Sequence, residues 1–277
     1  TRNSSSAASD VYKRQVVTQL QRSPGAFFDQ KFHPNGAKLF NARIIPIRGS
    51  WIDFTTDIND ILFTIIDRKR KFPATMLLRS LGFSSDEDIY NAFELILDLD
   101  PSKIDLEKLS NYVVIEDIID HETGELFVES GKELNESIIS TLKKNKTKSI
   151  KVVDVRNNID SMMIHNTIQK DPTKSTEEAL MKVYMLLRGS EAPSPESAEK
   201  FINRMFFFPK KYDLGQVGRY RLDKQFNLDN SGNDSVLTHD DFLITLKYLI
   251  QMRKGLRAPD DIDHLGHRRV RTGGEQL

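Results

Sequence analysis

The chain has 277 residues, 38% of them hydrophobic, and its 40 basic residues balance its 40 acidic ones. This length can form one large or two small cores, and the balanced charge excludes a whole-molecule field that would attract nucleic acid or an anionic membrane. The lack of cysteine excludes disulfide scaffolds, thiolate metal sites and cysteine nucleophiles. No apolar run is long enough to span a bilayer, so we expect a soluble, cytoplasmic protein without a membrane partner.

The chain starts with a polar stretch and continues with a strand-rich section. Residues 1–15, TRNSSSAASDVYKRQ, show no hydrophobic periodicity, and we interpret them as a disordered or foreign leader. Short β-type runs then alternate with turns: the turns lie at 22–25 and 48–50, and the runs at 16–20, 39–47, 51–55 and 61–67.

Two helices are predicted next, at 73–82 and 84–97. Ser85 or Asp86 would cap the second, whose inward face would carry Ile89, Phe93 and Ile96.

Residues 101–155 have a different pattern. Two β-type runs, at 111–120 and 125–130, flank the turn HETG, a short helix starts after Asn135, and a strand spans 149–155. We interpret this region as a small α+β insert.

The remaining sequence is mostly helical. Three helices have clear start signals: Ser175 with Glu178 as a capping box, Ser194 with Pro195, and Thr238 before an acidic first turn. Gly189 and Gly255 would end the first and third helices. Their inward residues would be Leu180, Val183, Leu187, Phe201, Ile202, Met205, Phe242, Leu246, Leu249 and Ile250. The fold class is therefore α+β: a mixed strand and helix domain of residues 16–100 and 156–277, with the insert at 101–155.

Two polar stretches are candidates for a metal site. Residues 227–238, NLDNSGNDSVLT, resemble a calcium loop, but Thr238 stands where a bidentate glutamate is needed, so a plain turn is favoured. Residues 260–269, DDIDHLGHRR, are rich in aspartate and histidine, but their spacing matches no established zinc or calcium pattern. Either they form a polar loop tied by salt bridges, or Asp263 accepts hydrogen bonds from a guanine edge while Arg268 and Arg269 hold phosphate or base.

Two further features have both a structural and a nucleic-acid interpretation. The run DRKRK at 67–71 follows an apolar strand, where it would protect a sheet edge or follow a phosphate backbone. Trp51, the single tryptophan, follows a glycine turn, where it would lie in the core or stack on an unpaired base. No nucleophile elbow, phosphate-cradling glycine loop or paired-carboxylate motif stands out.

Six stretches, in the same order, resemble the β subunit of bacterial DNA-directed RNA polymerase. They are VVTQLQRSPGAFFD, NARIIPIRGSWIDF, IDRKRKFPATMLLRSLG, DPTKSTEEALMKVYMLLR, KKYDLGQVGRYRL and DDIDHLGHRRVRTGGEQL. The resemblance runs from Val16 to Leu277 and covers a minority of a β subunit, the part called the lobe. It implies a fragment that forms one jaw of the DNA cleft in a nucleotidyltransferase that transcribes DNA.

The resemblance also implies specific contacts. Arg22, Ile262, Asp263 and Arg268 match a pocket for an unstacked non-template guanine, with Pro24 and Gly25 fixing the turn that aims Arg22. Trp51 matches the tryptophan that stacks on the neighbouring base. The remaining matches lie near the DNA path, namely Asp67, Arg68, Arg188 and Lys211, or at the edge of the rifamycin pocket, namely Gln19.

In this family the β′ subunit holds the catalytic magnesium, so we expect no catalytic residue, metal or cofactor in this chain. The expected partners are DNA, the α, β′ and ω subunits, and σ factor. Two other hypotheses remain. One is a free-standing interaction domain that binds protein or single-stranded DNA, and the other is a metal-dependent hydrolase centred on Asp260 to His267.

Overall fold

The computed structural model describes residues 19–101, 106–119, 126–144, 149–228, 235–261 and 264–271. The strands are β1 Gln19–Arg22, β2 Gly25–Phe32, β3 Lys38–Ile45, β4 Ile52–Thr56, β5 Leu62–Ile66, β6 Phe72–Pro73, β7 Leu97–Leu99, β8 Tyr112–Val114, β9 Ile118–Ile119, β10 Leu126–Val128, β11 Ile150–Asp154 and β12 Arg268–Arg271.

The α-helices are α2 Ala74–Ser80, α3 Asp86–Ala92, α4 Glu136–Lys144, α5 Ile159–Lys170, α6 Thr176–Arg188, α7 Pro195–Phe206, α8 Gly215–Phe226 and α9 His239–Arg253. Two 3-10 helices are η1 Leu106–Asn111 and η2 Leu265–His267. The mixture confirms the α+β class. Within the described ranges, no helix is both long and apolar enough to cross a membrane.

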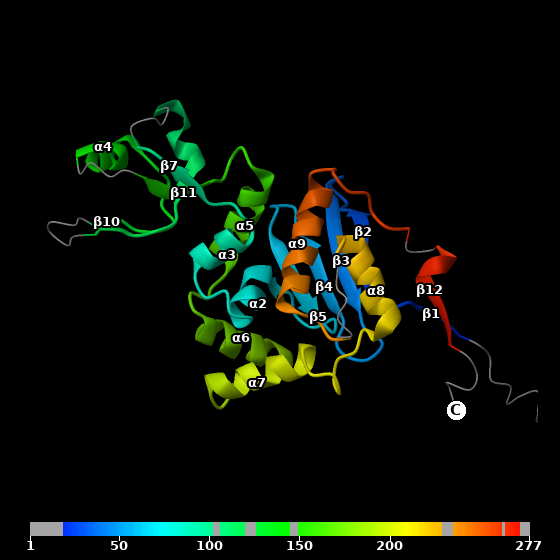
Figure 1. The fold of residues 1–277 in the computed structure, drawn as a ribbon. Coiled ribbons are helices and arrows are strands. Elements are labelled where there is room, and N and C mark those ends of the chain that lie inside the picture. Colours follow the sequence, from blue (N-terminus) through cyan, green and yellow to red (C-terminus); the bar gives the residue numbers. More distant parts are fainter. Residues whose placement is uncertain are drawn as a thin grey trace, which may run out of the picture.

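The centre of the described structure is a five-stranded antiparallel sheet in the order β2-β3-β4-β5-β6. Alternation buries Ala42, Ile44, Ile52 and Phe54 on the face that α8 and α9 cover (Figure 1). Four other helices complete the main core: α2 and α5 contact β5, and α6 packs on α2 and α7. Residues of β3 and β4 that point away from α8 and α9 are therefore available to form a site.

Strand β2 was missed in the sequence analysis. Phe27 and Phe28 are neighbours and both are buried, at 4% and 0% exposure. Phe28 faces the helices, whereas the ring of Phe27 meets the ring of His267 at 5.5 Å on the other face. A strand covered on both faces loses the alternating pattern by which strands are recognised.

The helix starts follow the predicted signals. Ser85 and Asp88 form a capping box for α3, and Thr238 and Asp241 form one for α9. For α6, Ser175 accepts from Glu178 N as predicted, but the Glu178 carboxylate accepts from Lys174 N.

The second predicted helix is wrong at its end. Helix α3 stops at Ala92, since Glu94 adopts φ +58°, and the next residues lead into β7. Ile96 therefore lies outside any helix.

A second hydrophobic cluster lies apart from the main core, at the far side of α3 and α5 (Figure 1). Its sheet has the order β7-β11-β8, and β9 pairs with β10 beside it. The buried residues of the cluster are Leu109, Val114, Val128, Leu134, Ile139, Leu142, Ile150 and Val152.

Strands β1 and β12 form a separate two-stranded ribbon (Figure 1). Arg22 pairs with Arg268 and Gln21 with Arg269 in its register. Ser23 N donates to His267 O at 3.0 Å, and Arg221 of α8 donates to Gly266 O. These contacts bring the two ends of the described chain beside the first strands of the main sheet.

Candidate nucleic-acid interface

Trp51 ends the turn that joins β3 to β4, and this turn is anchored to the segment before α8. Arg48 N donates to Asp213 O at 3.1 Å, and Asp213 N donates to Arg48 O at 2.8 Å. Gly49 has φ +130°, and a Cβ placed on it would lie 2.6 Å from Cδ2 of Tyr212. Because only glycine fits this close approach, a larger residue at position 49 would displace the turn, which presents Trp51 half-buried just before β4.

The turn after β5 holds Trp51 from the other side. Trp51 N donates to Oδ1 of Asp67 at 2.9 Å, and Asp67 N donates to Trp51 O at 3.0 Å. Asp67 and Arg68 both have positive φ, and Lys69 N donates to Ile66 O at 3.0 Å, as in a type I′ turn. Asp67, predicted to lie near DNA, thus positions Trp51.

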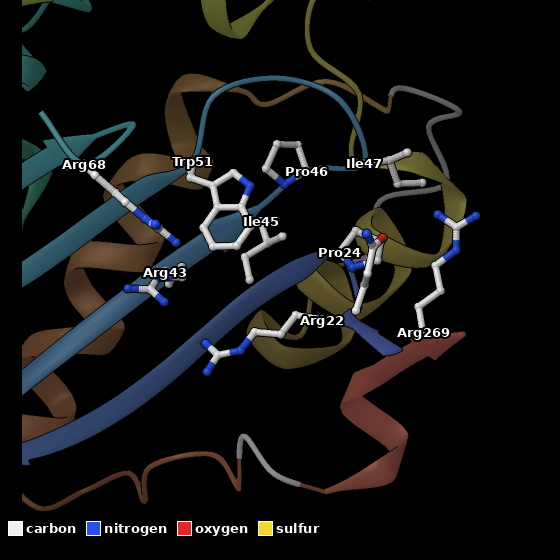
Figure 2. A pocket seen from close by; sticks show the side chains of 10 residues that line it. Arg22, Pro24, Arg43, Ile45, Pro46, Ile47, Trp51, Arg68 and Arg269 are labelled. Atoms are coloured by element: carbon white, nitrogen blue, oxygen red, sulfur yellow. The ribbon is translucent and has the colours of Figure 1, made fainter. Parts of the chain in front are cut away.

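A pocket of about 560 Å³ opens beside Trp51 (Figure 2). It is lined by Gln21, Arg22, Pro24, Arg43, Ile45, Pro46, Ile47, Trp51, Arg68 and Arg269. Four of these residues, Arg22, Trp51, Arg68 and Arg269, were predicted from sequence to contact DNA. The fold therefore gathers them from β1, β12 and two separate turns.

Arg43 belongs to the same pocket, although the sequence analysis missed it. Its Cζ lies 5.8 Å from the centre of the Trp51 ring, and Cζ of Arg68 lies 5.9 Å from that centre. Both distances are within the range of cation–π attraction. Among the described residues, none that line this pocket is acidic, so the pocket favours an anion. The usable signal was the strand alternation, which places Arg43 opposite to the buried Ala42 and Ile44.

The basic run 67–71 does not act as a unit. Lys69 donates to the Leu187 carbonyl near the end of α6, and Nζ of Lys71 lies 4.5 Å from the centre of the Phe63 ring. Only Arg68 of the run lines the pocket. Two of its lysines therefore contact other parts of the fold, whereas Arg68 lines the pocket.

Arg188 and Lys211 lie in a second groove of about 320 Å³, which Gly49 and Ser50 of the Trp51 turn also line. Its lining is Gly49, Ser50, Arg188, Phe201, Arg204, Met205 and Lys211. The guanidinium of Arg188 lies over Phe201, with Cζ 5.2 Å from the ring centre. Arg204 adds a third cation that the sequence analysis did not name.

The stretch 260–269 is only partly described, and Ile262 and Asp263 lie outside the described residues. The Asp260 carboxylate accepts from Phe28 N at 2.8 Å and from Gln225 Nε2 at 3.2 Å. Nδ1 of His264 accepts from Gly266 N at 3.0 Å. Asp260 and His264 therefore already have structural partners.

Arg268 is exposed on β12 and does not line the pocket of Trp51, whereas Arg269 does. Gln19 is exposed at the start of β1. Neither placement tests the role that the resemblance implies for that residue.

The calcium-loop interpretation falls mostly outside the described residues, which omit 229–234. Asn227 is the left-handed C-cap of α8, and Thr238 is the N-cap of α9. In the part of the chain that is described, no three His, Asp or Glu side chains gather as a metal-binding group.

Comparison with known families decides what the chain is related to. Residues 22–151 and 138–271 match the family model of RNA polymerase Rpb2, domain 2. The chain belongs to this family.

Curated relatives of this Rpb2 domain 2 chain are RNA polymerase subunits. It is 43% identical over 282 residues to the DNA-directed RNA polymerase subunit beta of Flavobacterium psychrophilum, and 44% identical over 282 residues to that of Porphyromonas gingivalis. The subunit beta of Bacteroides fragilis is 43% identical over 285 residues. Each alignment covers 96% of this chain and 22% of the relative. The chain thus spans about a fifth of the length of these relatives.

Proposed function

We propose that this chain forms the lobe of an RNA polymerase β subunit and binds unpaired non-template DNA beside Trp51. The observation that carries the proposal is the pocket that Trp51 lines together with four arginines, namely Arg22, Arg43, Arg68 and Arg269. An indole offers a stacking surface to any base, and guanidinium groups bind phosphate. A neutral chain needs such a local cluster to bind DNA at all.

The proposal includes a guanine contact next to this platform. Arg22 and Phe27 line a smaller pocket of about 140 Å³, Phe27 packs against His267, and Asp260 is bonded to Phe28. The described residues on both sides of Asp263 are thus attached to β2, near Arg22. Asp263 would accept from the N–H groups of the guanine edge, and Ile262 and Arg268 would complete the pocket.

The second groove extends the proposed contact along the strand. Arg188, Arg204 and Lys211 would bind phosphates, and the ring of Phe201 limits the freedom of Arg188. Because Gly49 and Ser50 line this groove and Trp51 lines the other, one strand could cross the turn and occupy both.

The activity proposed for the complete enzyme is DNA-templated RNA synthesis, with the magnesium held by β′ and with α, β′, ω and σ as partners. The free-standing binding module is not favoured, because the curated relatives named above are all subunits of an RNA polymerase.

The first experiment measures binding of a complete polymerase to a bubble template, with and without Trp51→Ala. We expect Trp51→Ala to weaken binding by about 5- to 150-fold, equivalent to about 1–3 kcal/mol of stacking. An abasic site at the stacked position is the matched control, because it removes the base and should abolish the difference between the two enzymes. Equal binding of both enzymes to the intact bubble would contradict the proposal.

A second experiment addresses the guanine. Replacing the non-template guanine by inosine removes one N–H donor and should weaken binding to the unmodified enzyme. Asp263→Ala should make the enzyme indifferent to this replacement. If inosine weakened binding to Asp263→Ala as much as it weakens binding to the unmodified enzyme, Asp263 would not contact the guanine.

A further inference from the structure

Arg43 and Asp53 form a cross-strand pair on the outer face of the main sheet. They are opposite each other in the register of β3 and β4. Nε of Arg43 donates to Oδ1 of Asp53 at 2.5 Å, and an NH2 group donates to Oδ2 at 3.2 Å. The two side chains are 34% and 14% exposed, so the pair is partly shielded from water. A two-point contact of this kind fixes both the position and the plane of the guanidinium.

The fixed guanidinium retains donors for a ligand. A guanidinium carries five N–H groups, and the two bonds to Asp53 leave both hydrogens of NH1 available. Arg43 lines the pocket of about 560 Å³ beside Trp51 and also the pocket of about 140 Å³ beside Phe27. It therefore stands at the boundary between the two proposed base sites.

Positive charge exceeds negative charge at this boundary, because Arg22, Lys31 and Arg43 line the smaller pocket with one acidic residue, Asp29. Arg22 lines both pockets as well, and its side chain points to the same side as that of Arg43 (Figure 2). Within the described residues, the side chains of Arg22 and Arg68 form no hydrogen bond or ion pair. Asp53 offsets part of the charge of Arg43, and an anion between Arg22 and Arg43 would lower the remaining repulsion between the two guanidinium groups.

We propose that Arg43 binds the phosphodiester that links the nucleotide stacked on Trp51 to its neighbour in the smaller pocket, and that Asp53 is a positioning residue for Arg43. This inference rests on the proposed function, since it names a contact of the same DNA strand. The ligand is a phosphodiester oxygen, because Arg43 lines both pockets and keeps both hydrogens of NH1 as donors.

The experiment uses complete polymerase and a bubble in which a neutral methylphosphonate replaces that one linkage. The unmodified enzyme should bind the modified DNA roughly tenfold or more weakly, since a bond to a charged group is lost. Arg43→Gln should bind natural DNA more weakly and show no further loss with methylphosphonate. For Arg43→Gln, the slope of log affinity against log salt concentration should be smaller in magnitude by about 0.7, which is the contribution of one phosphate contact on a single strand.

Arg43→Lys separates charge from geometry. A lysine keeps the positive charge but cannot form the two-point contact with Asp53. It should keep the salt slope and part of the methylphosphonate effect, whereas Arg43→Gln should lose both.

Asp53→Asn distinguishes positioning from simple charge. If Asp53 acted only as a nearby negative charge, its neutralisation would strengthen DNA binding. A positioning role predicts the opposite, weaker binding with a reduced methylphosphonate effect, because Arg43 loses its second attachment. Tighter binding by Asp53→Asn would overturn the positioning role.

Arg253→Gln is the matched control. Arg253 donates to Asp60 through Nε at 2.8 Å and NH2 at 3.3 Å, so it has the same pairing but lines neither pocket. It should bind both DNAs like the unmodified enzyme.

The inference would be overturned if methylphosphonate weakened binding to Arg43→Gln as much as it weakens binding to the unmodified enzyme. If Trp51→Ala still weakened binding in that case, the proposed function would stand without it. If neither Trp51→Ala nor the methylphosphonate changed binding, the proposed function would fail as well.

Discussion

Trp51 and Asp67 hold each other through two hydrogen bonds. The backbone N–H of Trp51 donates to the Asp67 carboxylate at 2.9 Å, and the backbone N–H of Asp67 donates to the Trp51 carbonyl at 3.0 Å. The indole is therefore positioned by a neighbouring turn and does not depend on its own strand alone.

The first prediction concerns this pair. Asp67→Ala removes the acceptor and places alanine at φ +49°, so we expect a loss of about 1–2 kcal/mol of unfolding free energy. Quenching of Trp51 fluorescence by acrylamide should increase. Asp67→Asn keeps both an acceptor oxygen and tolerance of the left-handed backbone, and should behave like the unmodified chain. If Asp67→Gly, which keeps only the backbone freedom, leaves quenching unchanged, the carboxylate does not hold the indole.

The second prediction concerns Gly49. Gly49→Ala combines a strained φ with a contact of 2.6 Å to the Tyr212 ring, so it should lower the unfolding free energy by about 2–4 kcal/mol. Gly36→Ala is the control, since Gly36 also has positive φ but no atom near its Cβ position. It should cost about 1–2 kcal/mol. If Gly49→Ala and Gly36→Ala lowered the free energy of unfolding in urea by the same amount, the contact with Tyr212 would have no effect on stability.

The third prediction concerns a buried ion cluster beneath the sheet. Arg219 of α8 donates to Asp241 at 2.7 and 2.9 Å and to Asp223 at 2.8 Å. Burial opposes the charge of Arg219, but the hydrogen bonds to Asp241 and Asp223 outweigh it and raise the pKa of the guanidinium. Asp241→Ala should therefore destabilise the fold by about 3–5 kcal/mol, because a buried charge loses its main partner.

Asp241 also accepts from Thr238 N, so its loss weakens the cap of α9. Thr238→Ala removes the other bond of this capping box, from Asp241 N to the threonine hydroxyl, and so gives the size of a capping effect, about 1 kcal/mol in chemical unfolding. A loss from Asp241→Ala no larger than that of Thr238→Ala would mean that the contact with Arg219 contributes little.

The fourth prediction concerns pH. Burial lowers the pKa of His165 below its ordinary value of 6.5, although Glu133 and Asp86 oppose the shift. Its neighbours are Tyr90, whose hydroxyl lies 2.9 Å from Nδ1, and Gln169, whose Nε2 lies 2.8 Å from Nε2 of the imidazole. Burial also raises the pKa of Tyr90, so its phenol stays protonated.

Because His165 has the lower pKa in the folded state, the unfolded chain binds the proton more readily. Stability should therefore fall as the pH decreases from about 6.5 towards the folded pKa of His165. His165→Gln should remove this part of the pH dependence. The midpoint of urea unfolding, measured between pH 5 and 8, gives the result, and an unchanged pH dependence in His165→Gln would contradict the assignment. Tyr90→Phe, which removes one hydrogen bond, should lower stability across the range.

Local patterns in the sequence predicted much of the fold. Caps at Ser85, Ser175, Ser194 and Thr238 mark helix starts, because a side-chain acceptor for the first free N–H groups must lie at the N-cap itself. Short β-type runs between turns predicted β3, β4 and β5. Both signals act over a few residues and depend little on the rest of the chain.

The failures have tertiary causes. Strand β2 was missed because His267, far along the chain, covers the outer side of Phe27. Helix α8 was not singled out because it starts with Gly215 and contains Gly218, where a Cβ would lie 3.0 Å from that of Pro24. Glycine lowers helix propensity, so the helical pattern of α8 is weak. At Gly218 the missing side chain allows α8 to approach the chain before β2 closely.

By itself the sequence determined the α+β class, the main capping residues and the resemblance to the polymerase β subunit, because these depend on short segments. It also named four of the ten residues that line the pocket beside Trp51 as DNA contacts, namely Arg22, Trp51, Arg68 and Arg269. Only the tertiary structure decided that Arg43 lines this pocket with Arg22, Arg68 and Arg269. It also decided that Asp67 positions Trp51 through two hydrogen bonds. The pocket depends on strand register and on two turns fixed by distant partners, and these long-range distances are set by packing.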